Sequence, residues 1–166
     1  MFNTKLGKQF LIFLVLSMLL SSCNVVQGRQ LDAKTREIQK NLYVPQDAAL
    51  LDQFSQVGPK KYVASNCIVA YLETAYGVSR PLTSIIEEYY DRLTQDGWEL
   101  NPHYALRRTD EDVYLRKGSQ LELVIYSYTD SGRAPSTKLP PEASRYTTAY
   151  VVALTYSEPS SLECSV

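Results

Sequence analysis

The stretch SRPLTSIIEEYYDRLTQDGW, residues 79–98, carries the clearest structural signal in the chain. Its large apolar side chains recur at the three- and four-residue spacing that places them on one face of a helix. Ser79 is the expected N-cap, Pro81 suits the first turn, and Gly97 supplies the left-handed residue that ends a helix. The sequence therefore predicts one amphipathic helix, whose apolar stripe is Leu82, Ile85, Ile86, Tyr89, Tyr90 and Leu93.

Segments rich in β-branched and aromatic residues flank this helix and are separated by turn signals. The first, residues 62–76, contains Asn66 and Glu73, which we expect to face water. The segment AALLDQF, residues 48–54, is too short to assign to a helix or a strand. One strand, one helix and then several closely spaced strands predict an α+β domain over residues 43–158, with an antiparallel sheet of four or five strands and the helix on one face. The later strand segments are 98–100, 104–109, 113–117, 121–128 and 147–156.

Three residue pairs around the helix are Tyr76-Gly77, Tyr89-Tyr90 and Gly97-Trp98. In this order they resemble a group of uncharacterised small exported bacterial proteins, in which a strand ending in Tyr-Gly precedes a helix with a tyrosine pair and then Gly-Trp. The resemblance covers about thirty residues. It implies an α+β fold and carries no catalytic residue.

Residues 1–22 have the layout of a secretory signal peptide. Lys5 and Lys8 form a basic head, no acidic residue precedes Cys23, and only Ser17 is polar within residues 10–20. The apolar run is short, because a membrane-spanning helix needs roughly 20 apolar residues. We therefore expect a signal peptide, and a short membrane anchor is the second interpretation.

The signal ends in Leu20-Ser21-Ser22-Cys23, which resembles the lipobox of bacterial lipoproteins. The resemblance implies cleavage before Cys23, a diacylglycerol on its sulfur and a further acyl chain on its new amino group. Two or more chains hold a protein stably on a bilayer, at about 0.8 kcal/mol per buried methylene. Lipoproteins retained at the inner membrane often carry Asp at the next position, where this chain has Asn24. We expect a lipid anchor on the cell membrane or outer membrane, facing the periplasm or the cell exterior; the alternative is an ordinary signal peptide with an incidental cysteine.

Removal of the signal leaves about 144 residues, a length that suits one domain. Two of the 17 basic residues leave with the signal, so 15 basic and 18 acidic residues give the mature chain a net charge of −3. This charge does not predict nucleic-acid binding, which needs a basic patch. The 13 tyrosines favour a tyrosine-rich sheet over a tyrosine-lined binding face, because tyrosine suits half-buried strands.

Residues 23–42 are expected to form a polar tether between the lipid and the domain, and residues 159–166 a polar tail. A flexible coil of the tether's length reaches about 25 Å. Leu31, Ile38 and Leu42 form a loose helical stripe, so part of the tether is a candidate helix.

Cys67 and Cys164 are the thiols that remain after lipidation. In an exported protein they either form a disulfide, which would stabilise the fold by about 4 kcal/mol for a loop of this length, or stay as one buried and one free cysteine. Neither cysteine has Cys or His neighbours at zinc spacing, so we expect no metal site. No cofactor motif is present, and a phosphate-binding glycine loop is absent from the sequence.

The candidate catalytic residues are few. His103 is the only histidine and lacks a nucleophile motif, so we expect an ordinary surface residue. Residues 110–112 are Asp-Glu-Asp but lack the further ligands of a calcium loop, and a solvated turn is favoured. Glu87, Glu88 and Asp91 are expected on the wet face of the helix, with Glu88 paired to Arg92.

The loop of residues 129–145 contains three prolines, and we expect it to lack regular structure. Loops of this length are often functional. We predict a noncatalytic binding or assembly module, anchored at Cys23, that contacts an unknown protein or small ligand through this loop. The alternatives are an envelope hydrolase that uses His103 with nearby carboxylates, and a structural spacer that pairs with itself through sheet edges.

Overall fold

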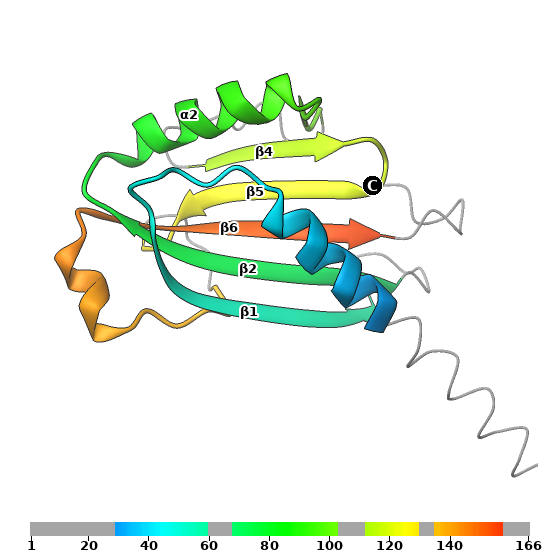
Figure 1. Cartoon of the computed structure of the whole chain (residues 1–166), viewed down its shortest axis with the longest axis horizontal. Helices are drawn as coiled ribbons and strands as arrows, with labels where there is room; N and C mark the ends of the chain where they lie inside the picture. Colours follow the sequence, from blue (N-terminus) through cyan, green and yellow to red (C-terminus); the bar gives the residue numbers. More distant parts are fainter. Residues whose placement is uncertain (1–28, 60–67, 103–111, 130–134, 158–166) are drawn as a thin grey trace, which may run out of the picture.

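A computed structural model describes residues 29–59, 68–102, 112–129 and 135–157 of the chain. One antiparallel sheet forms the body, and two helical segments lie on its front face (Figure 1). The predicted α+β class is confirmed.

In the part of the chain that the structure describes, the sheet contains six antiparallel strands in the order β1-β2-β6-β5-β4-β3. The prediction of four or five strands was too low, and the additional strand is β1, which contains most of the unassigned AALLDQF segment. Polar residues interrupt the apolar pattern of β1. It is an edge strand that pairs through its backbone with β2, the next strand along the chain. The strands are β1 Ala49–Pro59, β2 Ile68–Val78, β3 Glu99–Leu100, β4 Asp112–Lys117, β5 Leu121–Ser127 and β6 Thr148–Ser157.

The predicted helix is α2, Leu82–Gln95, and its apolar stripe packs on the sheet. The helix ends as the sequence predicts: Gly97 has φ +82°, its N–H donates to the Thr94 carbonyl at 3.1 Å, and the Trp98 N–H donates to the Leu93 carbonyl at 2.9 Å. These two bonds form a Schellman motif, which satisfies carbonyls that the helix leaves free.

The start of α2 differs from the prediction, because Pro81 and not Ser79 is the N-cap residue. Pro81 has ψ 147° and therefore lies outside the helix, and no side chain caps the first turn. A residue before proline is disfavoured in the helical region, so Arg80 does not extend the helix toward Ser79.

Residues 29–40 are helical, as the loose stripe in the tether suggested for Leu31 and Ile38. Leu31 is 1% exposed and packs with Ala70 of β2 and Tyr156 of β6. Further along the helix, Gln39 Nε2 donates to Thr74 Oγ1 at 2.6 Å. The helix lies across the front of the sheet (Figure 1), so the folded body begins before residue 43.

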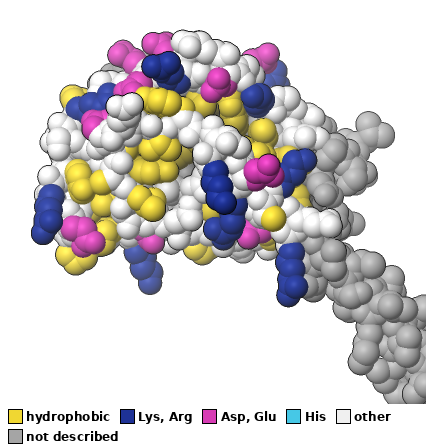
Figure 2. Space-filling view, viewed as in Figure 1, with side chains coloured by type: hydrophobic (Ala, Val, Ile, Leu, Met, Phe, Trp, Pro, Cys, Tyr) yellow, Lys and Arg dark blue, Asp and Glu magenta, His cyan; other side chains and the backbone are white. Residues whose placement is uncertain are grey.

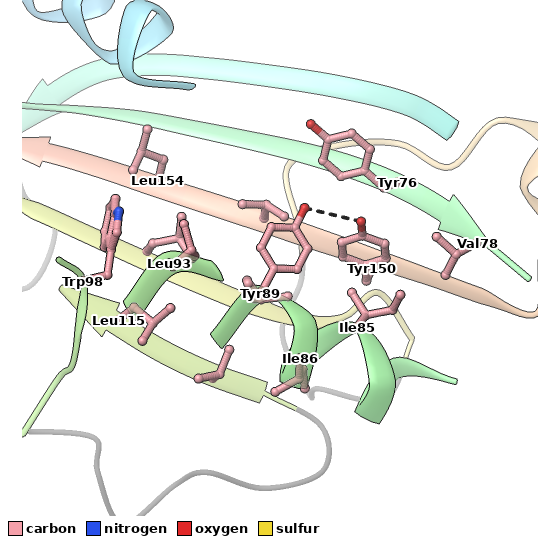
Figure 3. Packing of buried hydrophobic residues seen from close by; sticks show 14 residues of the cluster. Tyr76, Val78, Ile85, Ile86, Tyr89, Leu93, Trp98, Leu115, Tyr150 and Leu154 are labelled. Carbon is pink, nitrogen blue, oxygen red and sulfur yellow. Dashed lines mark hydrogen bonds between the residues drawn. The ribbon is translucent and has the colours of Figure 1, made fainter. Parts of the chain in front are cut away.

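Side chains of the central strands alternate between the two faces of the sheet. Tyr150, Val152 and Leu154 of β6 face the helices, whereas Val151 and Ala153 face the back. The sequence predicts this alternation, and Figure 3 shows the front cluster, in which Tyr89 and Leu93 of α2 point toward β6. In Figure 2, apolar side chains gather on the left half of the front face, with charged side chains around them.

Two long connections lie on opposite faces of the sheet. α2 links β2, which lies next to the edge strand β1, to β3 at the opposite edge and packs on the front. The connection from β5 to β6 supplies residues to the cluster on the back. It contains a short 3₁₀ helix, η2, Pro141–Arg145, so the prediction that this loop has no regular structure was wrong. Proline at the first position of η2 has no N–H to lose, and this suits it to a helix start.

Candidate functional site

The most unusual group on the back face is Glu73 of β2, which is 2% exposed. Its Oε1 accepts hydrogen bonds from the hydroxyls of Tyr71 and of Tyr126, the latter at 2.9 Å. Its Oε2 accepts from the backbone N–H groups of Ser136 at 2.5 Å and Thr137 at 3.2 Å. The expectation that Glu73 faces water was wrong, because these four donors replace the water that a carboxylate would otherwise need.

Residues 135–139, which we call the strap, cross the back face at this carboxylate. The Lys138 N–H donates to Asp52 Oδ2 of β1 at 2.6 Å, and the Tyr128 hydroxyl donates to the Thr137 carbonyl at 2.7 Å. Leu139 packs on the cluster of Ala75, Tyr126, Val151 and Ala153. The strap is therefore bonded to β1, to β2 and to the residue that follows β5, while its Ser136 and Lys138 are exposed.

Burial and the adjacent carboxylate keep the hydroxyls of Tyr71 and Tyr126 protonated, so both act as donors to Glu73. Burial raises the pKa of the Tyr71 hydroxyl and of the Tyr126 hydroxyl above the usual value, and the adjacent Glu73 raises both further. Both phenols therefore stay protonated at neutral pH and donate to the carboxylate. The arrangement holds residues 136 and 137 against β2.

A second polar group ties the segment before β1 to the start of α2. Arg80 donates to Asp47 through Nε at 2.9 Å and Nη2 at 3.1 Å, and also pairs with Glu88. This Arg80 hydrogen bond lowers the pKa of Asp47. Glu88 also accepts from the Tyr43 hydroxyl. The predicted Glu88–Arg92 pair is thus replaced by Glu88–Arg80, and the Arg92 guanidinium instead lies 5.7 Å from the centre of the Tyr43 ring.

Four tyrosines form an aromatic cluster between the helices and the sheet. Tyr89 packs edge-on against Tyr43 and Tyr150, at ring-centre distances of 5.6 and 6.1 Å, and Tyr76 stacks on Tyr150 at 5.5 Å. The Tyr89 and Tyr150 hydroxyls lie 3.4 Å apart (Figure 3). Tyr76, Tyr89 and Tyr150 are buried, so these rings serve the core and not an open binding face.

Several predicted site residues lie outside the described residues: Cys23, Cys67, Cys164 and His103. The lipid anchor, the disulfide and the hydrolase with His103 therefore remain predictions. Asp110 and Glu111 also lie outside, whereas Asp112 begins β4. Glu87 and Asp91 are exposed on α2, as predicted.

The sequence reasoning missed the carboxylate at the strap. Glu73 is a lone charged residue in the otherwise apolar run IVAYLETAY, and Tyr71 stands two positions earlier on the same face. An isolated charge on a central strand is a signal for a buried, hydrogen-bonded group, but its partners at 126, 136 and 137 are more than 50 residues away along the chain.

Within the described ranges no three His, Cys, Asp or Glu side chains come together in a way that would hold a metal ion. In the same part of the chain, each helix is too short or too polar to cross a membrane. Comparisons with protein-family models, curated proteins and solved structures found no match.

Proposed function

We propose that this protein is a lipid-anchored protein of the bacterial cell envelope, whose α+β domain is a noncatalytic binding or assembly module. The observation that carries the anchor is the sequence Leu20-Ser21-Ser22-Cys23 behind a basic head and an apolar run. The mature chain would begin at Cys23 and keep the acyl chains on that residue.

The contact surface that we propose is the strap together with η2. Three backbone N–H groups of the strap donate to the carboxylates of Glu73 and Asp52, and we expect these bonds to pre-organise its exposed side chains. Pre-organisation of this kind reduces the entropy lost when a partner binds. Ser136 and Lys138 of the strap, and Glu142 and Arg145 of η2, present mixed charges and hydroxyls that suit a polar protein surface.

The anchor is tested by growing cells with a clickable fatty acid and comparing the wild-type chain with Cys23→Ala. We expect label on the wild type and none on the variant. Equal labelling of the two chains, or no label on the wild type, would contradict the anchor.

The contact surface is tested by a photo-crosslinking amino acid at position 138, compared with the same group at exposed Lys40 on the helix of residues 29–40. We expect a discrete adduct from position 138 and none from position 40. Adducts of equal yield from both positions would show that the strap is not the contact.

A second candidate, self-association through β1, has one observation in its favour. β1 has 11 residues, pairs only with β2, and carries Asp52 as its single charge. Leu50 on this strand is 63% exposed, more than any other large apolar side chain in the described residues. A long, nearly uncharged edge strand is a template for pairing with another chain.

Light scattering after size exclusion on a soluble chain without Cys23 distinguishes the two candidates. Self-association predicts a dimer that Gln56→Lys, on the edge strand, converts to a monomer. Glu87→Lys on the exposed face of α2 is the control and should leave the dimer intact. A wild-type monomer at all concentrations would remove this candidate.

A further inference from the structure

The structure shows where the helix of residues 29–40, the described part of the chain nearest to Cys23, meets the sheet. The helix of residues 29–40 starts at the end of the sheet where β6 finishes, because Leu31 packs on Tyr156 and Ala70. It then runs along β2, because Gln39 reaches Thr74. We call the end with Ser157 and Leu121 the proximal end, and the end with Thr148 and Val78 the distal end.

We propose that the anchored domain holds its proximal end against the bilayer headgroups and directs its distal end, with Arg80 and the start of β6, away from the membrane. This proposal rests on the proposed lipid anchor at Cys23. It adds an orientation, and with it the surface that a partner in the aqueous compartment can reach.

The short connection between Cys23 and the helix limits how the domain can be oriented. Residues 24–28 separate Cys23 from the helix, and even fully extended the step from Cys23 to Arg29 spans only about 20 Å. Along β6, Tyr156 and Thr148 are eight residues apart, which is about 27 Å in a strand. An inverted domain, with its distal end on the bilayer, would lift Arg29 further from the lipid than this connection can reach.

The limit on length holds only if the helix of residues 29–40 stays packed on the sheet. Thr35 is 1% exposed and its hydroxyl donates to the Leu31 carbonyl at 2.8 Å. Arg36 Nη2 donates to Ser55 Oγ of β1 at 2.5 Å. Residues 29–40 are therefore part of the folded body and add nothing to the free length. Arg29 is exposed at the start of this helix, where its cation suits lipid phosphates.

The orientation is tested on the acylated full-length mature chain in vesicles that contain a lipid with a nitroxide on its headgroup. A fluorescent amino acid is placed at Ser119, in the turn before β5, or at Thr147, just before β6; both positions are exposed and all cysteines remain in place. We expect quenching several-fold stronger at position 119 than at position 147. Equal quenching, or stronger quenching at 147, would overturn the orientation.

A matched variant tests the length argument itself. A 20-residue Gly-Ser segment inserted between Val26 and Gln27 removes the limit, since such a coil extends well beyond 27 Å at full stretch. The difference between positions 119 and 147 should then shrink while the protein stays on the vesicles. A difference that persists unchanged would show that the connection does not set the orientation.

Failure of the anchor and failure of the orientation give different results. Intact mass and flotation with the vesicles report acylation before any quenching is measured. A chain without acyl mass that does not float overturns both proposals. An acylated chain that floats but is quenched equally at both positions overturns the orientation alone.

Discussion

Removal of the Glu73 carboxylate is the perturbation that best tests how the strap is held. Glu73→Ala leaves the buried N–H of Thr137 without its acceptor. The Tyr126 hydroxyl loses the carboxylate but keeps Tyr71 as a hydrogen-bonding neighbour. A buried donor left unsatisfied costs about 1–3 kcal/mol. The hydroxyl of Tyr71, which is only partly buried, and the N–H of exposed Ser136 can turn to water at a smaller cost. We therefore expect a loss of about 2–3 kcal/mol in the free energy of unfolding, the upper part of the range for one buried donor, because the acceptor that is lost is charged.

Glu73→Gln keeps the size of the side chain and one acceptor oxygen but removes the negative charge. The amide oxygen can still accept from the strap while its NH₂ group faces the tyrosine hydroxyls, which can accept. The charge-assisted part of the bonds is lost, so we expect a smaller loss, about 1–2 kcal/mol.

Thr137→Val is the control within the strap. The Thr137 hydroxyl is buried and has no hydrogen-bond partner among the described residues. Its replacement by an isosteric methyl group should leave stability unchanged or raise it by up to about 1 kcal/mol.

Chemical denaturation gives the three free energies, and hydrogen exchange at the amides of residues 136–138 shows whether the strap detaches. Glu73→Ala should speed exchange at these amides more than at those of α2. The reasoning fails if Glu73→Ala costs less than about 1 kcal/mol, the lower bound for a single unsatisfied donor. Unchanged strap exchange in this variant would also refute it.

Three further predictions concern the core and the helix end. Ile86→Asp buries an unpaired charge in the main cluster and should unfold the domain, which circular dichroism would show; a cooperative melt near the wild-type temperature would contradict the packing of α2. Gly97→Ala forces a side chain into φ +82° and should cost about 1–2 kcal/mol. Gly58→Ala, where φ is ordinary and a Cβ would make only an ordinary contact with the Gln56 side chain, should cost less; equal melting temperatures would contradict the Schellman end. Burial holds the pKa of five tyrosines in the folded protein above the unfolded value of about 10. The stability that these groups contribute is therefore complete below about pH 10 and is lost as the pH rises above it. An alkaline titration followed by tyrosinate absorbance tests this. These groups should ionise only as the chain unfolds, and full ionisation of all 13 tyrosines in a still-folded protein would contradict their burial; the five are Tyr71, Tyr76, Tyr89, Tyr126 and Tyr150.

The parts of the fold that could be predicted from the sequence are those set by local pattern. The stripe of α2 follows helical spacing, Gly97 marks its end, and the alternation in 147–156 identifies a central strand. These features depend on residues within one or two turns of each other.

The parts that could not be predicted depend on contacts that local spacing does not encode. β1 is an edge strand that is stabilised by pairing with β2, and its polar residues obscure the alternation that would identify a strand. From the sequence, Glu73 is expected to face water, because its partners Tyr126 and Thr137 become its neighbours only in the folded sheet. The strap and η2 sit in a proline-containing loop, whose fixed position comes from backbone N–H groups and not from any side-chain pattern.

The central claim is that acyl chains on one cysteine hold this domain at a membrane surface. Intact-mass spectrometry of the chain purified from the membrane fraction tests it most directly. We predict a polypeptide that begins at Cys23 and carries the added mass of a diacylglycerol and a further acyl chain. A chain that still begins at Met1, or one that begins at residue 23 without acyl mass, would contradict the claim.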